Sequence, residues 1–236
     1  MVCFLGWILV GCDSSEQTAN DPAKPAMAND PTSLFHSAKE KQAVGAYDAA
    51  IAELNRAIAG DPGYIAAHFL MGEIYKEWDR RDEAVAAYIK TIELDSNHYE
   101  ARLALAAVYS KSGRNSLALK EYLAAAKVHP EDPEVHFKIA LEYWYMQQLE
   151  ECAAAYRKVI ELKQDHLQAH LNIASVYEAM KDWDQALREI GLSIQMAQLT
   201  GNSQAVAIAE NKLKFFKGRA DMTEEDIRRK TSPPFN

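Results

Sequence analysis

The sequence predicts an all-α protein, an α-solenoid of five helical hairpins followed by a capping helix. Three observations lead to this fold class. Glycine and proline are few, at 10 and 8 of 236 residues, which favours helices over turn-rich sheets. A period of 34 residues runs through most of the chain, and apolar residues recur at helical spacing twice in each period. A period of this length is typical of units that stack in a row.

The period is visible in three columns of the sequence. One is a column of tyrosines, the second consists of small residues, and the third is mostly aromatic: Tyr75, Tyr109, Tyr143 and Tyr177; Ala50, Ala84, Ala118, Cys152 and Ala186; Leu54, Tyr88, Tyr122, Tyr156 and Ile190. Five units therefore tile the chain without an insertion, over residues 31–64, 65–98, 99–132, 133–166 and 167–200.

Ahead of the first unit, residues 1–11 form an apolar stretch that is too short to cross a bilayer, which requires about 20 residues. Residues Leu9 to Cys12, "LVGC", resemble the lipobox of bacterial lipoproteins. That resemblance implies a signal peptide over residues 1–11 and lipidation of Cys12, with residues 12–30 as the lipid anchor and a polar tether. The stretch departs from the usual signal because it carries no Lys or Arg. A true start codon upstream of Met1, or an accidental apolar start, remain the alternatives.

Each unit reads as two helices joined by a tight turn. In residues 99–132 the first helix has Leu105 and Tyr109 on one face, and the second has Leu119 and Tyr122 on one face. Gly113 marks the turn, since glycine accepts a positive φ without penalty. Pro130, near the end of this unit, stops the second helix.

Neither helix can bury its apolar face alone, so the units must stack. A fourth column of small residues in the first helices shows where backbones approach closely: Ala38, Gly72, Ala106, Ala140 and Ala174. Gly72 supports a tight contact, because a mid-helix glycine costs roughly 0.5–1 kcal/mol relative to alanine. Cys152, which belongs to the facing small column, is then interpreted as a small buried hydrophobe.

These columns resemble the tetratricopeptide repeat (TPR) pattern of small residue, tyrosine, turn glycine, alanine, aromatic, alanine and proline. The resemblance covers about 170 of the residues and recurs five times. Ser37 and Lys41 depart from it in the first unit, and Asp79, Gln147 and Lys181 replace the turn glycine in three others.

The resemblance implies a superhelix whose inner wall is made by the first helices and binds a protein or peptide partner. We expect this groove to centre on four residues of the fourth unit, Phe137, Leu141, Trp144 and Tyr145. The same positions of the other units extend it through Phe69, Glu73, Lys76, Leu103, Lys111 and Leu171. Half-buried packing between units is the alternative for this apolar rail. The residues of a chaperone-type carboxylate clamp are not found at the matching positions.

After the last unit, residues 201–218 break the period but keep helical spacing, and they predict a capping helix. Ser203 is a candidate for its N-cap and Gly218 for its C-terminal end. Its apolar stripe consists of Val206, Ala209, Leu213 and Phe216. A polar-backed terminal helix of this kind keeps repeat arrays soluble. Residues 219–236 predict a mobile tail with at most a short helical turn from Thr223.

Composition and motifs argue against several classes of function. The formal charge of −8 and the absence of a basic patch argue against nucleic acid as a partner. His68, His136 and His170 share one position of the repeat, but units about 8–10 Å apart are too distant to place two of them on one zinc ion. No nucleophile elbow, phosphate loop, metal motif or cofactor fingerprint is found, so we expect neither an enzyme nor a bound cofactor.

The sequence thus predicts a scaffold or adaptor held by lipid on Cys12 at the inner or outer membrane of a bacterial envelope, facing the periplasm. Its groove would bind a peptide segment or protein partner. Two alternatives remain within this class: a pilotin-like assembly factor for pilus or secretion machinery, and a soluble cytoplasmic TPR adaptor.

Overall fold

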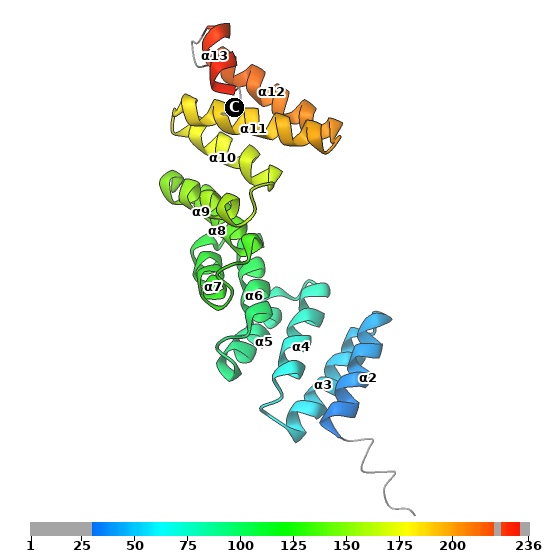
Figure 1. The fold of residues 1–236 in the computed structure, drawn as a ribbon. Coiled ribbons are helices and arrows are strands. Elements are labelled where there is room, and N and C mark those ends of the chain that lie inside the picture. Colours follow the sequence, from blue (N-terminus) through cyan, green and yellow to red (C-terminus); the bar gives the residue numbers. More distant parts are fainter. Residues whose placement is uncertain (1–29, 220–222, 232–236) are drawn as a thin grey trace, which may run out of the picture.

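The computed structural model describes residues 30–219 and 223–231, and over these ranges every regular element is a helix. The predicted all-α solenoid is confirmed. Five hairpins follow one another along a curved row, from α2 at the blue end to α11 at the orange end (Figure 1). The signal peptide, Cys12 and the tether up to residue 29 lie outside the described residues.

The two helices of each hairpin pack against each other, and each hairpin packs against the next. First helices are 13 residues long; second helices are 14 residues long, except α11, which has 17. The pairs are α2 (Pro31–Ala43) with α3 (Tyr47–Gly60), α4 (Ile65–Glu77) with α5 (Arg81–Leu94), α6 (Tyr99–Lys111) with α7 (Asn115–Val128), α8 (Pro133–Tyr145) with α9 (Leu149–Leu162), and α10 (Leu167–Ala179) with α11 (Trp183–Leu199).

All five hairpin turns use a left-handed residue at the same position of the repeat. Gly45 and Gly113 have φ values of 74° and 69°. Asp79, Gln147 and Lys181 adopt the same conformation with φ values of 57°, 58° and 63°, although side chains disfavour it. The stacked helices on either side therefore impose the turn even where glycine is missing.

The small columns lie at the closest helix contacts. Their alanines are fully buried, and a Cβ atom added to Gly72 would meet the ring of Tyr88. Cys152 is also fully buried and its Sγ donates a hydrogen bond to the carbonyl oxygen of Ala140 at 3.2 Å. Burial raises the pKa of this thiol to about 12, which makes it unreactive at neutral pH.

The histidine column ties hairpins together. In three units the Nε2 atom of the histidine lies 2.8–3.1 Å from the carbonyl oxygen of the residue six positions earlier, in the loop between hairpins: His68 with Pro62, His136 with Pro130 and His170 with Gln164. Arg102 makes the equivalent contact with Ser96 at 2.7 Å. Among the described residues, no group of three potential ligands could hold a metal ion.

The C-terminal region packs on α11. Helix α12 (Ser203–Arg219) covers the last hairpin, as predicted for a cap, and Asn202 rather than Ser203 accepts the capping hydrogen bond, from the Ala205 amide at 3.0 Å. Gly218 lies inside the helix instead of ending it. The described part of the chain contains no helix long and apolar enough to cross a membrane.

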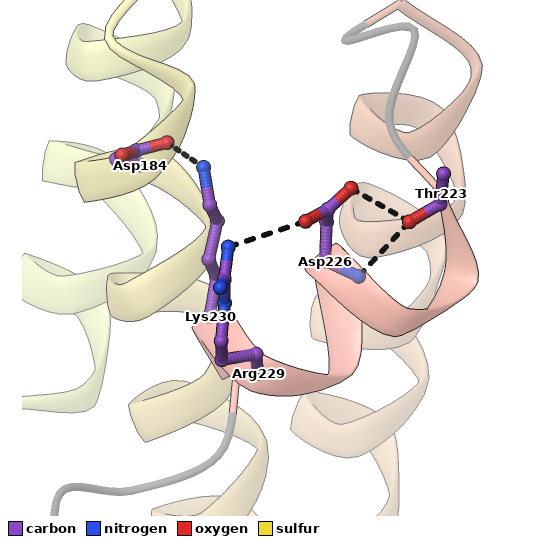
Figure 2. Close-up of polar contacts among 5 residues, drawn as sticks. All are labelled: Asp184, Thr223, Asp226, Arg229 and Lys230. Carbon is purple, nitrogen blue, oxygen red and sulfur yellow. Dashed lines mark hydrogen bonds and ion pairs between the residues drawn. The ribbon is translucent and has the colours of Figure 1, made fainter.

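The prediction of a mobile tail over residues 219–236 is wrong for residues 224–231, which form helix α13 (Glu224–Thr231) packed on α11. Ile227 is buried. Lys230 pairs with Asp184 of α11, and the Thr223 hydroxyl caps the helix by accepting a hydrogen bond from the Asp226 amide (Figure 2). The local sequence is strongly charged, so its helix depends on this docking rather than on a wide apolar face of its own.

A groove wall with two pockets

The first helices present two pockets along one wall of the array. The α8–α10 pocket has a volume of about 240 Å³. It contains three of the four residues expected at the centre of the groove, Leu141, Trp144 and Tyr145, which α8 contributes. Its remaining lining comes from α9 and α10: Tyr156, Asn172, Ser175 and Val176.

The second, the α4–α8 pocket, has a volume of about 390 Å³. The predicted groove residues Phe69, Glu73, Lys76 and Leu103 line it. Helices α6, α7 and α8 complete it with Tyr99, Glu100, Ala104, Ala107, Tyr122, Glu134, Val135 and Lys138. Because α8 contributes to both pockets, they follow one another along the same wall.

Two tyrosines of the mostly aromatic column line these pockets, although the sequence does not predict them as groove residues. Tyr122 and Tyr156 come from second helices and are 4% and 1% exposed, yet each lines a pocket. The same column holds Leu54 and Ile190 at the two ends of the array. This restriction of tyrosine to the middle units is the sequence signal, because a buried hydroxyl needs a polar partner.

Hydrogen bonding differs between these hydroxyl groups. Tyr88, their counterpart in the second unit, donates to Glu73 at 2.5 Å. The Tyr156 oxygen accepts a hydrogen bond from the Asn172 amide at 2.9 Å, which leaves its own O–H to be donated into the pocket. Burial raises the pKa of Tyr156 and raises that of Tyr122 to about 12, so both hydroxyl groups stay protonated at neutral pH.

The charged residues of the α4–α8 pocket are partly compensated within the wall. The Oε2 atom of Glu73 accepts a bond from Lys76 at 2.5 Å, while its Oε1 atom accepts the Tyr88 hydroxyl. Glu73 therefore holds Lys76 and Tyr88 in place. Glu134 is more than half exposed and lies 3.5 Å from the Nε2 atom of His166.

Three predicted groove residues lie elsewhere. Phe137 is half-buried and stacks on His166, with ring centroids 5.1 Å apart, so it packs between units and lines neither pocket. Leu171 is only 3% exposed and belongs to the core, so the prediction that it faces a partner is wrong. Lys111 is exposed, but it lines neither pocket. The repeat register alone does not separate these positions, since neighbouring side chains determine how deep each one lies.

Comparison with known proteins supports the repeat assignment. Two tetratricopeptide repeat family models match, over residues 77–140 and 133–166. A comparison with curated protein sequences gives no match.

Several solved structures share the fold. MamA from Desulfovibrio magneticus RS-1 is similar with a TM-score of 0.64 at 19% identity, covering 73% of this chain and 97% of its own. YrrB, described as a TPR protein with an unusual peptide-binding site, has a TM-score of 0.66 at 19% identity and covers 80% and 97%. The structure of pilF from Pseudomonas aeruginosa has a TM-score of 0.55 at 16% identity, and the match covers 80% of this chain and 92% of its own. Residues 77–166 thus match tetratricopeptide repeats, and the described part of the chain folds as a solenoid of five helical hairpins.

Proposed function

We propose that this chain is a protein-interaction scaffold that binds an extended segment of a partner along the wall formed by α4, α6, α8 and α10. The α8–α10 pocket carries the proposal, because it combines an aromatic rim with buried polar groups at one point of the wall. YrrB, a protein of similar fold, is described as having a peptide-binding site, which agrees with this proposal.

The pocket has the features of an anchoring site. Tyr145 is 58% exposed and Trp144 is half-buried, so both rings can be covered by a partner. Covering aromatic rings supplies most of the affinity in such interfaces. Tyr156 and Asn172 at the base can bond the partner's backbone, because they provide a hydroxyl donor and an amide group.

We further propose that lipid on Cys12 holds the array at a bacterial envelope membrane, on its periplasmic side. The support is the "LVGC" sequence and the polar stretch that follows it. Residues 13–30 would span about 25 Å if they follow coil statistics, enough to hold the array off the membrane surface.

Crosslinking tests the groove. A photoreactive residue replaces Tyr145 in the full chain, and the crosslinked partners are identified with and without Trp144→Ala. We expect Trp144→Ala to remove the dominant partner. Leu117→Ala, which truncates a leucine that is 44% exposed on a second helix, should leave it in place. An identical partner set in both variants would exclude the α8–α10 pocket as the anchor.

Metabolic labelling with a fatty acid tests the anchor independently. We expect label on the wild type and none on Cys12→Ala. Equal label in both would favour the soluble adaptor, whereas a lipidated protein whose dominant partner is a pilus or secretion component would favour the pilotin-like role.

A further inference from the structure

One face of the capping helix α12 is not fully covered by α11. Ala205, Ala209 and Phe216 are its buried stripe, spaced for one side of a helix. On the flank next to this stripe, Ile208 and Phe215 are 44% and 54% exposed, seven positions apart and therefore on the same side. A helix that only shields the last hairpin would not be expected to place two large apolar residues in solvent.

This flank faces the groove wall. Lys212 lies between the buried stripe and the flank and donates a hydrogen bond to Oγ of Ser175. Ser175 belongs to α10 and lines the α8–α10 pocket. Glu178, one turn after Ser175 on α10, forms an ion pair with Arg219 of α12 at 3.0 Å. The exposed flank of α12 therefore adjoins the pocket.

The charges here are unevenly matched. Glu178 is paired with Arg219, whose guanidinium also lies 5.3 Å from the centroid of the Phe215 ring. Lys212 is part-buried, and within the described ranges its hydrogen-bond partner is the neutral Ser175 hydroxyl. Burial lowers the pKa of Lys212, and the nearby Glu178 opposes this only in part. A carboxylate of a bound partner would stabilise the charged form of such a part-buried ammonium group through a charge-assisted hydrogen bond.

We propose that α12 is a wall of the partner-binding groove, where Ile208 and Phe215 contact an apolar side chain and Lys212 binds an acidic side chain of the same partner segment. The inference rests on the proposed peptide-binding function and adds the chemistry of the partner: an Asp or Glu close to a large apolar residue. It also assigns a binding role to a helix whose sequence reads as a cap.

Two matched peptide arrays test this inference with the full chain. One array displays peptides in which Leu, Phe or Trp is followed at varied spacing by Asp or Glu, and in the other Asn or Gln replaces each acid. We expect the wild type to prefer the acidic array by about tenfold, the size of one charge-assisted contact. Lys212→Gln should lose this preference, whereas Lys212→Arg should retain it. Phe215→Ala should weaken binding to both arrays.

Matched controls separate these effects from general damage. Lys214→Gln changes an exposed lysine of the same helix, and Leu199→Ala truncates an exposed leucine at the same end of the array. Both should bind as the wild type does. Equal binding to the two arrays, with Phe215→Ala unchanged and Trp144→Ala weakened, would overturn the role of α12 but leave the groove. If Trp144→Ala were also without effect, or the wild type bound neither array, the groove itself would be contradicted.

Discussion

Gly72 and Tyr88 approach so closely that a Cβ atom on Gly72 would lie 2.5 Å from Cε1 of the tyrosine ring. The ring is fully buried and its hydroxyl is bonded to Glu73, so it cannot swing away without losing that bond. The tyrosine thus fills the space that glycine leaves between α4 and α5.

The first prediction follows from this contact. Gly72→Ala should lower the free energy of unfolding by about 1–3 kcal/mol, because overpacking outweighs the gain in helix propensity. Gly218→Ala is the control, since nothing lies within 4 Å of its added Cβ, and it should be neutral or stabilising. Urea unfolding of both variants measures the difference. A Gly72→Ala protein more stable than the wild type would show that the ring relaxes freely.

The second prediction concerns the hairpin turns. Lys181→Gly should raise stability by about 1 kcal/mol, because lysine at a φ of 63° is strained and glycine is not. The reciprocal change Gly113→Ala, at a φ of 69°, should lower it by a similar amount, although its Cβ meets nothing within 4 Å. Urea midpoints of the two variants should therefore move in opposite directions; shifts of the same sign would contradict the backbone explanation.

The third prediction concerns pH and Glu142. This side chain is 2% exposed, and its Oε2 atom lacks a hydrogen-bond partner among the described residues. Burial raises the pKa of Glu142 above 4.5, and a hydrogen bond from Ser110 opposes this only in part. The folded state therefore binds the proton more tightly than the unfolded state does. The stabilisation from that proton is complete below pH 4.5 and is lost as pH rises through the folded pKa.

Glu142→Val tests this, because Val108 and Val176 occupy the same position of neighbouring units and are buried. At pH 7 the variant should be more stable than the wild type by about 1–3 kcal/mol, and the advantage should shrink as pH falls toward 4.5. Denaturant titrations at several pH values measure it, with Glu150→Gln, an exposed carboxylate on α9, as the control. A pH-independent advantage would point to packing rather than ionisation.

The fourth prediction concerns the docking of α13. A Cβ atom on Gly191 would overlap the backbone of Thr231, so Gly191→Val should release the helix and expose Ile227. The loss of that burial is worth about 2 kcal/mol. Amide exchange of residues 224–231 should accelerate, while the hairpins keep their protection. If the amide exchange of α13 were unchanged in Gly191→Val, the helix would have another way to pack. Lys230→Ala, which removes an exposed ion pair (Figure 2), should have a much smaller effect.

The sequence predicts part of the candidate site. Leu141, Trp144 and Tyr145 come from one helix, so local spacing was enough to place them together. Tyr156 and Ser175 could not be added in this way, because the pocket brings α9 and α10 against α8. Leu171 was placed wrongly for a related reason: its depth depends on neighbouring helices rather than on its own register.

The sequence by itself determined the all-helical fold, the 34-residue unit and the small residues at its closest contacts. It could do so because each unit repeats the same local pattern, and a repeated pattern makes its buried face visible. Only the tertiary structure showed that Lys212 reaches Ser175, 37 positions away, and that α13 docks over Gly191. Such contacts depend on the rotation of each hairpin against the next and on the helices that follow the last repeat. The local period of the sequence encodes neither of these.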